Sequence, residues 1–206
     1  MAAFVLAVEL VWLAVAIPLR GAVQWRRTGS IGFRLGRGGI VELLGGILSG
    51  AAIVTALAAP ILDLAGVVGS IPALLRPLWQ VIGVALLLAG AVASSAAQFA
   101  MGDSWRIGVD PNERTALVTA GPYRWVRNPI YTAFTAVFTG AALALATSVA
   151  LVSAALAILA VQVQARLIEE PYLRAAHGPA YAAYAAATGR FLPGLGRLRH
   201  PTGAWA

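Results

Sequence analysis

Residues 121–131 read Gly-Pro-Tyr-Arg-Trp-Val-Arg-Asn-Pro-Ile-Tyr, and the interpretation of the chain starts from this stretch. It ends the longest polar segment between apolar runs, residues 100–128, and leads directly into the next apolar run. Asn is a preferred helix N-cap and Pro is favoured in the first turn, so Asn128 and Pro129 predict that a helix begins here. The arginines could equally anchor to lipid phosphate, and the aromatic side chains could form an interfacial belt.

The rest of the chain is dominated by apolar residues. Of its 206 residues 60% are hydrophobic and 11% are charged, whereas charged residues make up about a quarter of a soluble protein. We predict an all-α, polytopic membrane protein that forms a single domain, residues 1–206. Its five transmembrane helices are expected at about residues 1–19, 40–64, 74–99 or 77–99, 129–146 and 148–168, and a C-terminal cytoplasmic helical segment should follow them. The first should stop at Pro18, and the last two should form a tight hairpin about Thr147.

The arginines indicate how the helices are oriented. The net charge is +7, but the cations lie in short loops between apolar runs, which does not favour nucleic-acid binding. Fourteen of the fifteen arginines fall on one side of the five-span topology, and only Arg76 falls on the other. Basic loops stay in the cytoplasm, so we expect the N-terminus outside and the C-terminus in the cytoplasm, in the inner membrane of a bacterium. Residues 20–39 are predicted to be a basic interfacial loop that could be partly helical on the membrane surface, and residues 194–206 a basic tail.

Polar residues also gather at the end of the last apolar run. Gln162, Arg166, Glu169 and Glu170 are spaced to form one stripe on a helix. A charge inside a membrane helix costs about 2.5–3.5 kcal/mol unless it is paired or hydrated, so the stripe should face a protein interior or a wet pocket. The alternative is a simple interfacial salt bridge between Arg166 and Glu170. The hairpin would bring this stripe to the same membrane face as residues 121–131.

Several kinds of chemistry have no support in the sequence. Without cysteine there can be no disulfide or thiolate, and His177 and His200 are too scattered to predict a metal site. No convincing catalytic base is found, so the catalytic residues stay unknown at this stage.

The order of motifs resembles the isoprenylcysteine carboxyl methyltransferase family. The resemblance rests on the quoted stretch, followed by Arg-Leu-Ile-Glu-Glu-Pro-Tyr-Leu (166–173), Gly-Pro-Ala-Tyr-Ala-Ala-Tyr (178–184) and Gly-Arg-Phe-Leu-Pro (189–193), with Trp-Arg-Ile-Gly (105–108) ahead of them. It covers about residues 101–193, so residues 100–193 are expected to be the catalytic core and residues 1–99 the first three spans. Two positions depart from the family's pattern: Asn128 replaces its His, and His177 stands where Phe is usual.

The resemblance implies an integral-membrane enzyme that transfers a methyl group from S-adenosyl-L-methionine to a lipophilic acceptor, for instance a carboxylate, at the cytoplasmic face. The implied partners are membrane lipids and a lipophilic small molecule or lipidated acceptor. The cofactor-binding residues implied are Tyr123, Arg127, Asn128, Pro129, Tyr131, Arg166, Glu169, Glu170, Tyr181 and Tyr184. Replacing Glu170 with Ala is expected to abolish cofactor binding without unfolding the protein. An NADPH-dependent reductase of a sterol-like lipid and a non-enzymatic lipid-binding protein are the two alternatives.

Overall fold

The computed structural model describes residues 1–34, 39–109 and 115–198. The all-α prediction is confirmed: 76% of the chain is helical, and these residues form no strand. Arg37, Asp110, Glu113, Arg114, His200 and most of the predicted basic tail lie outside the described residues.

The first helix does not stop at Pro18, so this prediction was wrong. Helix α1 (Ala2–Ala14) continues through a π-helical turn (Val15–Leu19) into α2 (Arg20–Thr28). Helix α2 is followed by its C-cap residue Gly29, which has a left-handed φ of 73°. A π turn changes the local hydrogen-bonding register, and such turns are a common way for a helix to accommodate a proline. Residues 20–28 of the predicted interfacial loop are therefore a helix.

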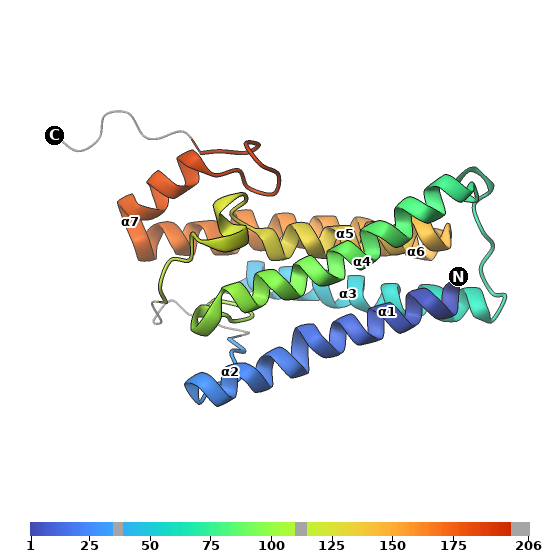
Figure 1. The fold of residues 1–206 in the computed structure, drawn as a ribbon, viewed down its shortest axis with the longest axis horizontal. Coiled ribbons are helices and arrows are strands. Elements are labelled where there is room, and N and C mark those ends of the chain that lie inside the picture. Colours follow the sequence, from blue (N-terminus) through green and yellow to red (C-terminus); the bar gives the residue numbers. More distant parts are fainter. Residues whose placement is uncertain (35–38, 110–114, 199–206) are drawn as a thin grey trace.

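Four further helices build the bundle (Figure 1): α3 (Gly39–Leu64), α4 (Pro77–Ala100), α5 (Pro129–Leu145) and α6 (Ser148–Val163). Helix α4 packs mainly on α5, and α3 on α6. A Cβ atom at Gly90 would lie 2.8 Å from the carbonyl oxygen of Ala133, so this glycine lets α4 and α5 approach closely. Ala146 and Thr147 connect α5 to α6, and Ala146 has a left-handed φ of 54°.

The helices fit an integral membrane protein. Among the residues that the structure describes, four helical stretches are long and apolar enough to cross a membrane: Ala2–Thr28, Gly39–Leu64, Pro77–Ala100 and Ser148–Ala187. The fifth expected span, α5, is a shorter apolar helix of 17 residues. Side chains such as Ile40 (72% exposed) and Val92 (71% exposed) point away from the bundle, as lipid-facing residues do.

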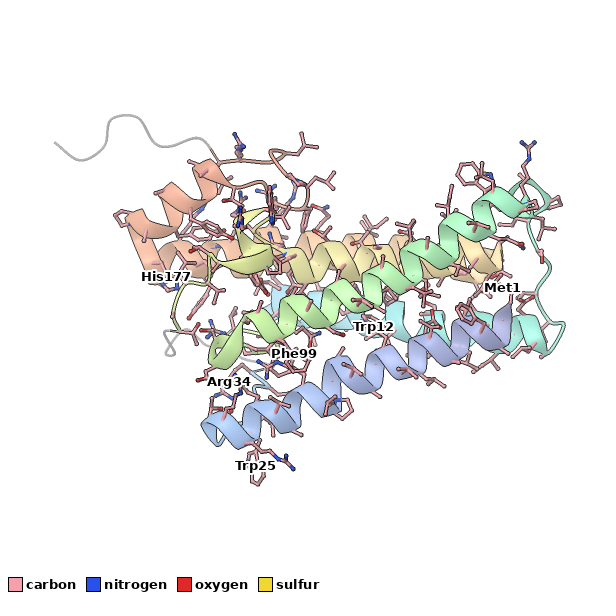
Figure 2. The ribbon with its side chains drawn as sticks, in the orientation of Figure 1. Met1, Trp12, Trp25, Arg34, Phe99 and His177 are labelled. Atoms are coloured by element: carbon pink, nitrogen blue, oxygen red, sulfur yellow. The ribbon has the colours of Figure 1, made fainter. Side chains whose placement is uncertain are left out.

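One end of the bundle carries most of the polar structure, and we call it the polar end. It comprises α2, the segments 101–109 and 115–128, and α7 (Glu170–Ala187), whereas Met1 and the α3–α4 connection lie at the opposite end (Figures 1 and 2). Helix α6 runs into a second π turn (Gln164–Glu169) and then into α7, which bends at Gly178 (φ 50°). Two isolated bridges tie this end together: Phe33 pairs with Ile107, and Val126 pairs with Gly189.

Candidate functional site

A cavity of about 400 Å³ opens at the polar end and extends into the bundle. Its volume is in the range of small-molecule sites, which are about 300–1,000 Å³. Its walls come from α1, α3, α5, the π turn after α6, and α7, together with segments 101–109 and 115–131. The structure places eight of the ten sequence-predicted residues on these walls: Tyr123, Arg127, Asn128, Pro129, Tyr131, Glu169, Tyr181 and Tyr184.

The turn before α5 positions Tyr123. Gly121 begins a 3-10 turn (Gly121–Arg124) with a φ of 59°, and Pro122 follows in its first turn. The buried Tyr123 hydroxyl donates to the carbonyl of Ala97 at 3.3 Å, and the Tyr184 hydroxyl donates to the carbonyl of Tyr123 at 2.6 Å. Burial raises the pKa of the Tyr123 phenol well above its ordinary range, so this group stays neutral. One tyrosine of α7 is thereby tied to the turn that precedes α5.

Asn128 occupies the N-cap position of α5, but its side chain does not cap the helix. Its Nδ2 atom instead donates to the carbonyl of Arg190 at 3.1 Å, and its backbone N–H donates to the same oxygen at 3.1 Å. Asn128 therefore joins the start of α5 to the segment after α7 while it lines the cavity.

Glu169 faces the cavity beside residues of α5, α7 and segment 101–109. The hydroxyl of Tyr131, on α5, donates a hydrogen bond to its carboxylate. The guanidinium of Arg106 lies 5.1 Å from the ring centre of Tyr172, and both residues line the cavity. We call Arg106, Tyr131, Glu169 and Tyr172 the Glu169 wall. It offers a carboxylate, a cation and two aromatic rings to a bound molecule.

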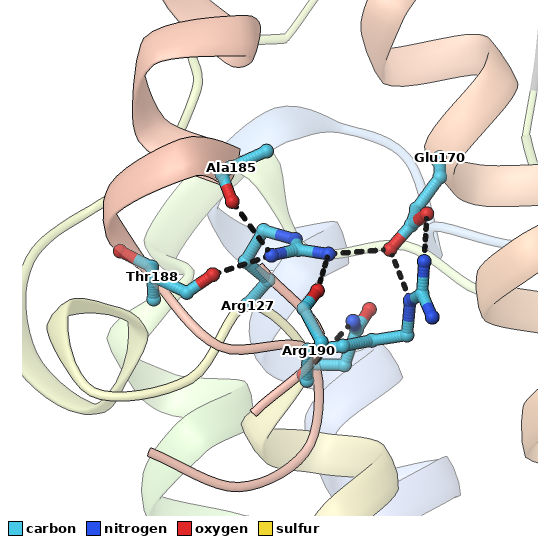
Figure 3. Close-up of polar contacts among 7 residues, drawn as sticks. Arg127, Glu170, Ala185, Thr188 and Arg190 are labelled. Atoms are coloured by element: carbon cyan, nitrogen blue, oxygen red, sulfur yellow. Dashed lines mark hydrogen bonds and ion pairs between the residues drawn. The ribbon is translucent and has the colours of Figure 1, made fainter. Parts of the chain in front are cut away.

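Glu170 has a different environment, which we call the clasp and which comprises Arg127, Glu170 and Arg190 (Figure 3). Arg127 Nη2 lies 2.9 Å from Glu170 Oε1, and Arg190 binds both Glu170 oxygens, with Nε to Oε1 at 2.6 Å and Nη2 to Oε2 at 2.9 Å. Arg127 also donates to the carbonyl oxygens of Ala185, Thr188 and Gly196. The clasp therefore fixes the C-terminal segment against the start of α5.

The predicted polar stripe does not exist as one face, and this part of the sequence interpretation was wrong. Residues 164–169 are π-helical, so spacings derived from 3.6 residues per turn do not apply across them. Arg166 is exposed and lies outside the cavity walls, as does the buried Glu170, whereas Gln164 is on the walls. The alternative of a simple Arg166–Glu170 salt bridge also fails, because Glu170 pairs with Arg127 and Arg190.

The cavity has an apolar arm that runs between the helices. It is lined by Trp12 and Leu13 of α1, Ile17 of the π turn that follows, Ile53 of α3, and Phe134 of α5. Trp12 and Phe134 are in ring contact, with centroids 5.4 Å apart, and Trp12 lies about halfway along the bundle in Figure 2. The cavity therefore joins a polar chamber at the polar end to an apolar space in the bundle interior.

Sequence reasoning missed several of the cavity residues. Arg106 and Tyr172 lie inside quoted motifs but were not singled out. Trp12, Glu42 and Ile53 come from the first half of the chain, which offered no motif. Only the packing of α1 and α3 against the later helices brings them to the site.

Comparison with protein families now adds to this geometry. The model of the phospholipid methyltransferase family matches residues 78–180, which is half of the chain. The chain belongs to this family. A search of curated proteins found no match.

The matched region of this phospholipid methyltransferase family member runs from the start of α4 into α7, so it contains the Glu169 wall and most of the clasp. The family belongs to the same group of integral-membrane methyltransferases as the isoprenylcysteine carboxyl methyltransferases, so the resemblance drawn from the motifs is confirmed. Tyr181, Tyr184 and Arg190 lie just beyond the match. The apolar arm draws on α1 and α3, which lie wholly outside it.

Proposed function

We propose that this protein transfers a methyl group from S-adenosyl-L-methionine to a lipid acceptor within the large cavity. The family match supports methyl transfer, and the observation that carries the proposal is the shape of the cavity. A polar chamber for a soluble cofactor is joined there to an apolar arm for a lipid. We also propose that the chain crosses the membrane five times and that the short helix α5 forms one of these five spans.

The residues of the polar chamber fit this cofactor. S-adenosyl-L-methionine supplies an electrophilic methyl group on a cationic sulfonium, and it also carries an ammonium, a carboxylate, ribose hydroxyls and adenine. Glu169 can accept hydrogen bonds from the ammonium or the ribose, and Arg106 can pair with the carboxylate. The rings of Tyr172, Tyr181 and Tyr184 offer faces for adenine or the sulfonium.

The residues of the chain would contribute to catalysis mainly by positioning the two reactants and by excluding water from them. The buried partners of Tyr123, Tyr131 and Tyr184 hold these side chains in fixed orientations. Holding two reactants in a fixed orientation and removing water both contribute strongly to the rate of a displacement reaction. We assign no general base, because the acceptor group has not been identified.

The apolar arm supports a lipid acceptor. Trp12, Leu13, Ile53 and Phe134 present hydrocarbon surface that a fatty chain can cover. The lipid would reach the arm sideways from the bilayer. The family match favours neither the reductase nor the non-enzymatic alternative.

The first test is ligand binding to the detergent-purified protein. A ligand that binds only the folded state stabilises it by about 2.7 kcal/mol at 100 times its Kd. S-adenosyl-L-methionine and its demethylated product should raise the Tm, whereas NADPH should leave it unchanged. No stabilisation by either sulfur compound, or stabilisation by NADPH alone, would refute the proposal.

We further propose that the polar end faces the cytoplasm of a bacterial cell. The absence of native cysteine allows single cysteines to report the orientation. Ala65 lies exposed after α3, at the end opposite the polar end, and Ala175 lies exposed on α7. A membrane-impermeant maleimide should label Ala65→Cys in intact cells and Ala175→Cys only after lysis. The reverse pattern would show that the orientation is inverted.

A further inference from the structure

Arg20 is the first residue of α2, and it is almost completely buried, with 1% of its surface exposed. Burying a guanidinium group costs free energy unless its N–H groups find partners. Nη1 donates to Oε1 of Gln24 at 2.9 Å, Nε donates to the carbonyl of Gln98 at 3.4 Å, and Nη2 donates to the carbonyl of Gly102 at 2.5 Å. Gln98 and Gly102 lie within the stretch that the family match covers, and Arg20 lies outside it. Arg20 therefore joins the two halves of the chain.

One of these contacts caps the end of α4. The last four carbonyl groups of a helix have no partner within the helix, and α4 ends at Ala100. The carbonyl of Gln98 accepts from Arg20, and the carbonyl of Ala97 accepts from the hydroxyl of Tyr123 at 3.3 Å. A cation is also favoured at this end by the helix dipole. Arg20 and a tyrosine of the large cavity thus hold the same helix end.

Arg20 and Gln24 also hold the segment that follows α4. The guanidinium carbon of Arg20 lies 5.6 Å from the ring centre of Phe99, which Figure 2 labels at this end of the bundle, and 4.6 Å from that of Trp105. Nε2 of Gln24 donates to the carbonyl of Asp103 at 2.7 Å. Trp105 is 3% exposed, so the cation and the ring are packed together away from water.

The same segment is held by a second part of the first half. The N–H of Ile107 donates to the carbonyl of Gly32 at 2.8 Å. A Cβ atom at Gly32 would lie 3.0 Å from the ring of Trp105, so the backbone there packs directly on the ring. Arg106, which lines the large cavity, stands between Trp105 and Ile107. Its neighbours on both sides are therefore held by residues that precede α3.

We propose that Arg20 is a positioning residue for the cofactor site. By holding the end of α4 and the ring of Trp105, it fixes the backbone from which Arg106 reaches the carboxylate of the cofactor. The inference rests on the proposed function, which pairs Arg106 with that carboxylate. Arg20 is not on the wall of the large cavity, so it acts through Arg106 and not on a reactant. The first half of the chain then serves the cofactor as well as the apolar arm.

The test compares S-adenosyl-L-methionine with its decarboxylated form, by calorimetric titration of the full chain in detergent. Both compounds carry the sulfonium, an ammonium, the ribose and adenine, and only the first carries the carboxylate that Arg106 would hold. Arg20→Met keeps a long side chain and removes the charge and the donors. It should weaken binding of S-adenosyl-L-methionine about tenfold, the loss of one charge-assisted contact, and leave the affinity for the decarboxylated form unchanged.

Three further variants complete the comparison. Arg20→Lys keeps a cation beside Trp105 and should retain most of the wild-type affinity. Gln24→Met keeps the guanidinium group and removes the bond to Asp103, so it should show the same selective loss at a smaller size. This variant decides the question if Arg20→Met does not fold. Arg26→Met is the matched control, because Arg26 is exposed on the same helix, and it should bind both compounds like the wild type.

Hydrogen exchange tests the positioning without any cofactor. Peptides that cover residues 101–109 should exchange faster in folded, ligand-free Arg20→Met than in the wild type, while peptides of α5 should not. Unchanged exchange in this segment, or unchanged affinity for S-adenosyl-L-methionine, would overturn the inference. An equal loss of affinity for both compounds would also overturn it, because it would show a general structural role. A wild type that binds neither compound would refute the proposed function, and the exchange would still decide whether Arg20 holds the segment.

Discussion

The Glu169 wall and the clasp differ in what their two adjacent carboxylates contact. Glu169 accepts a hydrogen bond from Tyr131 and faces the large cavity. Glu170 lies between Arg127 and Arg190 and is not on the cavity wall. Under the proposed function, these two identical neighbours have different roles: Glu169 binds the ligand and Glu170 holds the fold. Mutations can test this division because the two regions should respond in different measurements.

The largest effect is expected from Arg127→Ala. Its side chain and that of Glu170 are almost completely buried (1% and 5% exposed), and removing one partner of a buried ion pair costs about 3–5 kcal/mol. The free energy of unfolding in detergent should fall by this order. Arg124→Ala is the control, because Arg124 is exposed and stacks on Trp125. Equal losses in the two variants would mean that the clasp does not hold the fold.

The next effect concerns Glu169→Gln, which should leave stability nearly unchanged and weaken binding of S-adenosyl-L-methionine at least tenfold, or about 1.4 kcal/mol. Calorimetric titration measures this directly. Glu170→Gln should show the opposite pattern, with lower stability and retained affinity in the folded fraction. This prediction replaces the sequence-based expectation for Glu170→Ala, because Glu170 pairs with Arg127 and Arg190 and is not on the cavity wall. The exposed Arg166→Gln should change neither quantity. A loss of affinity in Glu170→Gln alone would reverse the assignment of the two glutamates.

A smaller effect is expected from Tyr131→Phe. This change removes one hydrogen bond to Glu169 and keeps the ring, so the affinity for the cofactor should fall by about 0.5–1.5 kcal/mol. Combining it with Glu169→Gln should add little, because both changes remove the same contact. Fully additive losses in this double-mutant cycle would show that Tyr131 acts independently of Glu169.

The smallest effect is expected when the pH is changed and the contribution of the clasp to stability is measured. The hydrogen bonds to Glu170 raise the pKa of Arg190 above its ordinary value, which is already far above neutral. A raised pKa gives stability that is present at lower pH and is lost only when the pH rises through the folded-state value. The stability difference between the wild type and Arg190→Gln should therefore stay constant from pH 7 to pH 9. A difference that falls within this range would show that the clasp depends on another titrating group.

The sequence predicted much of the helical framework. The spans expected from Ile40 and from Pro77 match α3 and α4, and Pro129 does begin α5. The π turns at Val15–Leu19 and Gln164–Glu169 were not predicted, because a pattern of apolar and polar residues assumes a constant helical period. The first of them led to the wrong helix end at Pro18, and the second to the wrong polar stripe.

The candidate site was predictable only where a motif marked it. Tyr123, Asn128 and Tyr131 line the cavity as expected. The Glu170 side chain points toward Arg190. Arg190 comes close to Glu170 only because the C-terminal segment folds back, and no motif in the sequence predicts that fold. The contributions of Trp12 and Ile53 depend on how the first half packs against the second, and a single sequence contains no record of that packing.

The clasp also has a consequence for how the protein is made. Ribosomes synthesise the chain from its N-terminus, and the partners of the Arg127 side chain lie between residues 170 and 196. During synthesis, Arg127 and the start of α5 therefore exist before any of these partners have been added. A nascent chain released or stalled before Arg190 therefore lacks the contacts that fix the C-terminal segment and α7 against the start of α5. The stability that the clasp contributes is thus gained only at the end of synthesis.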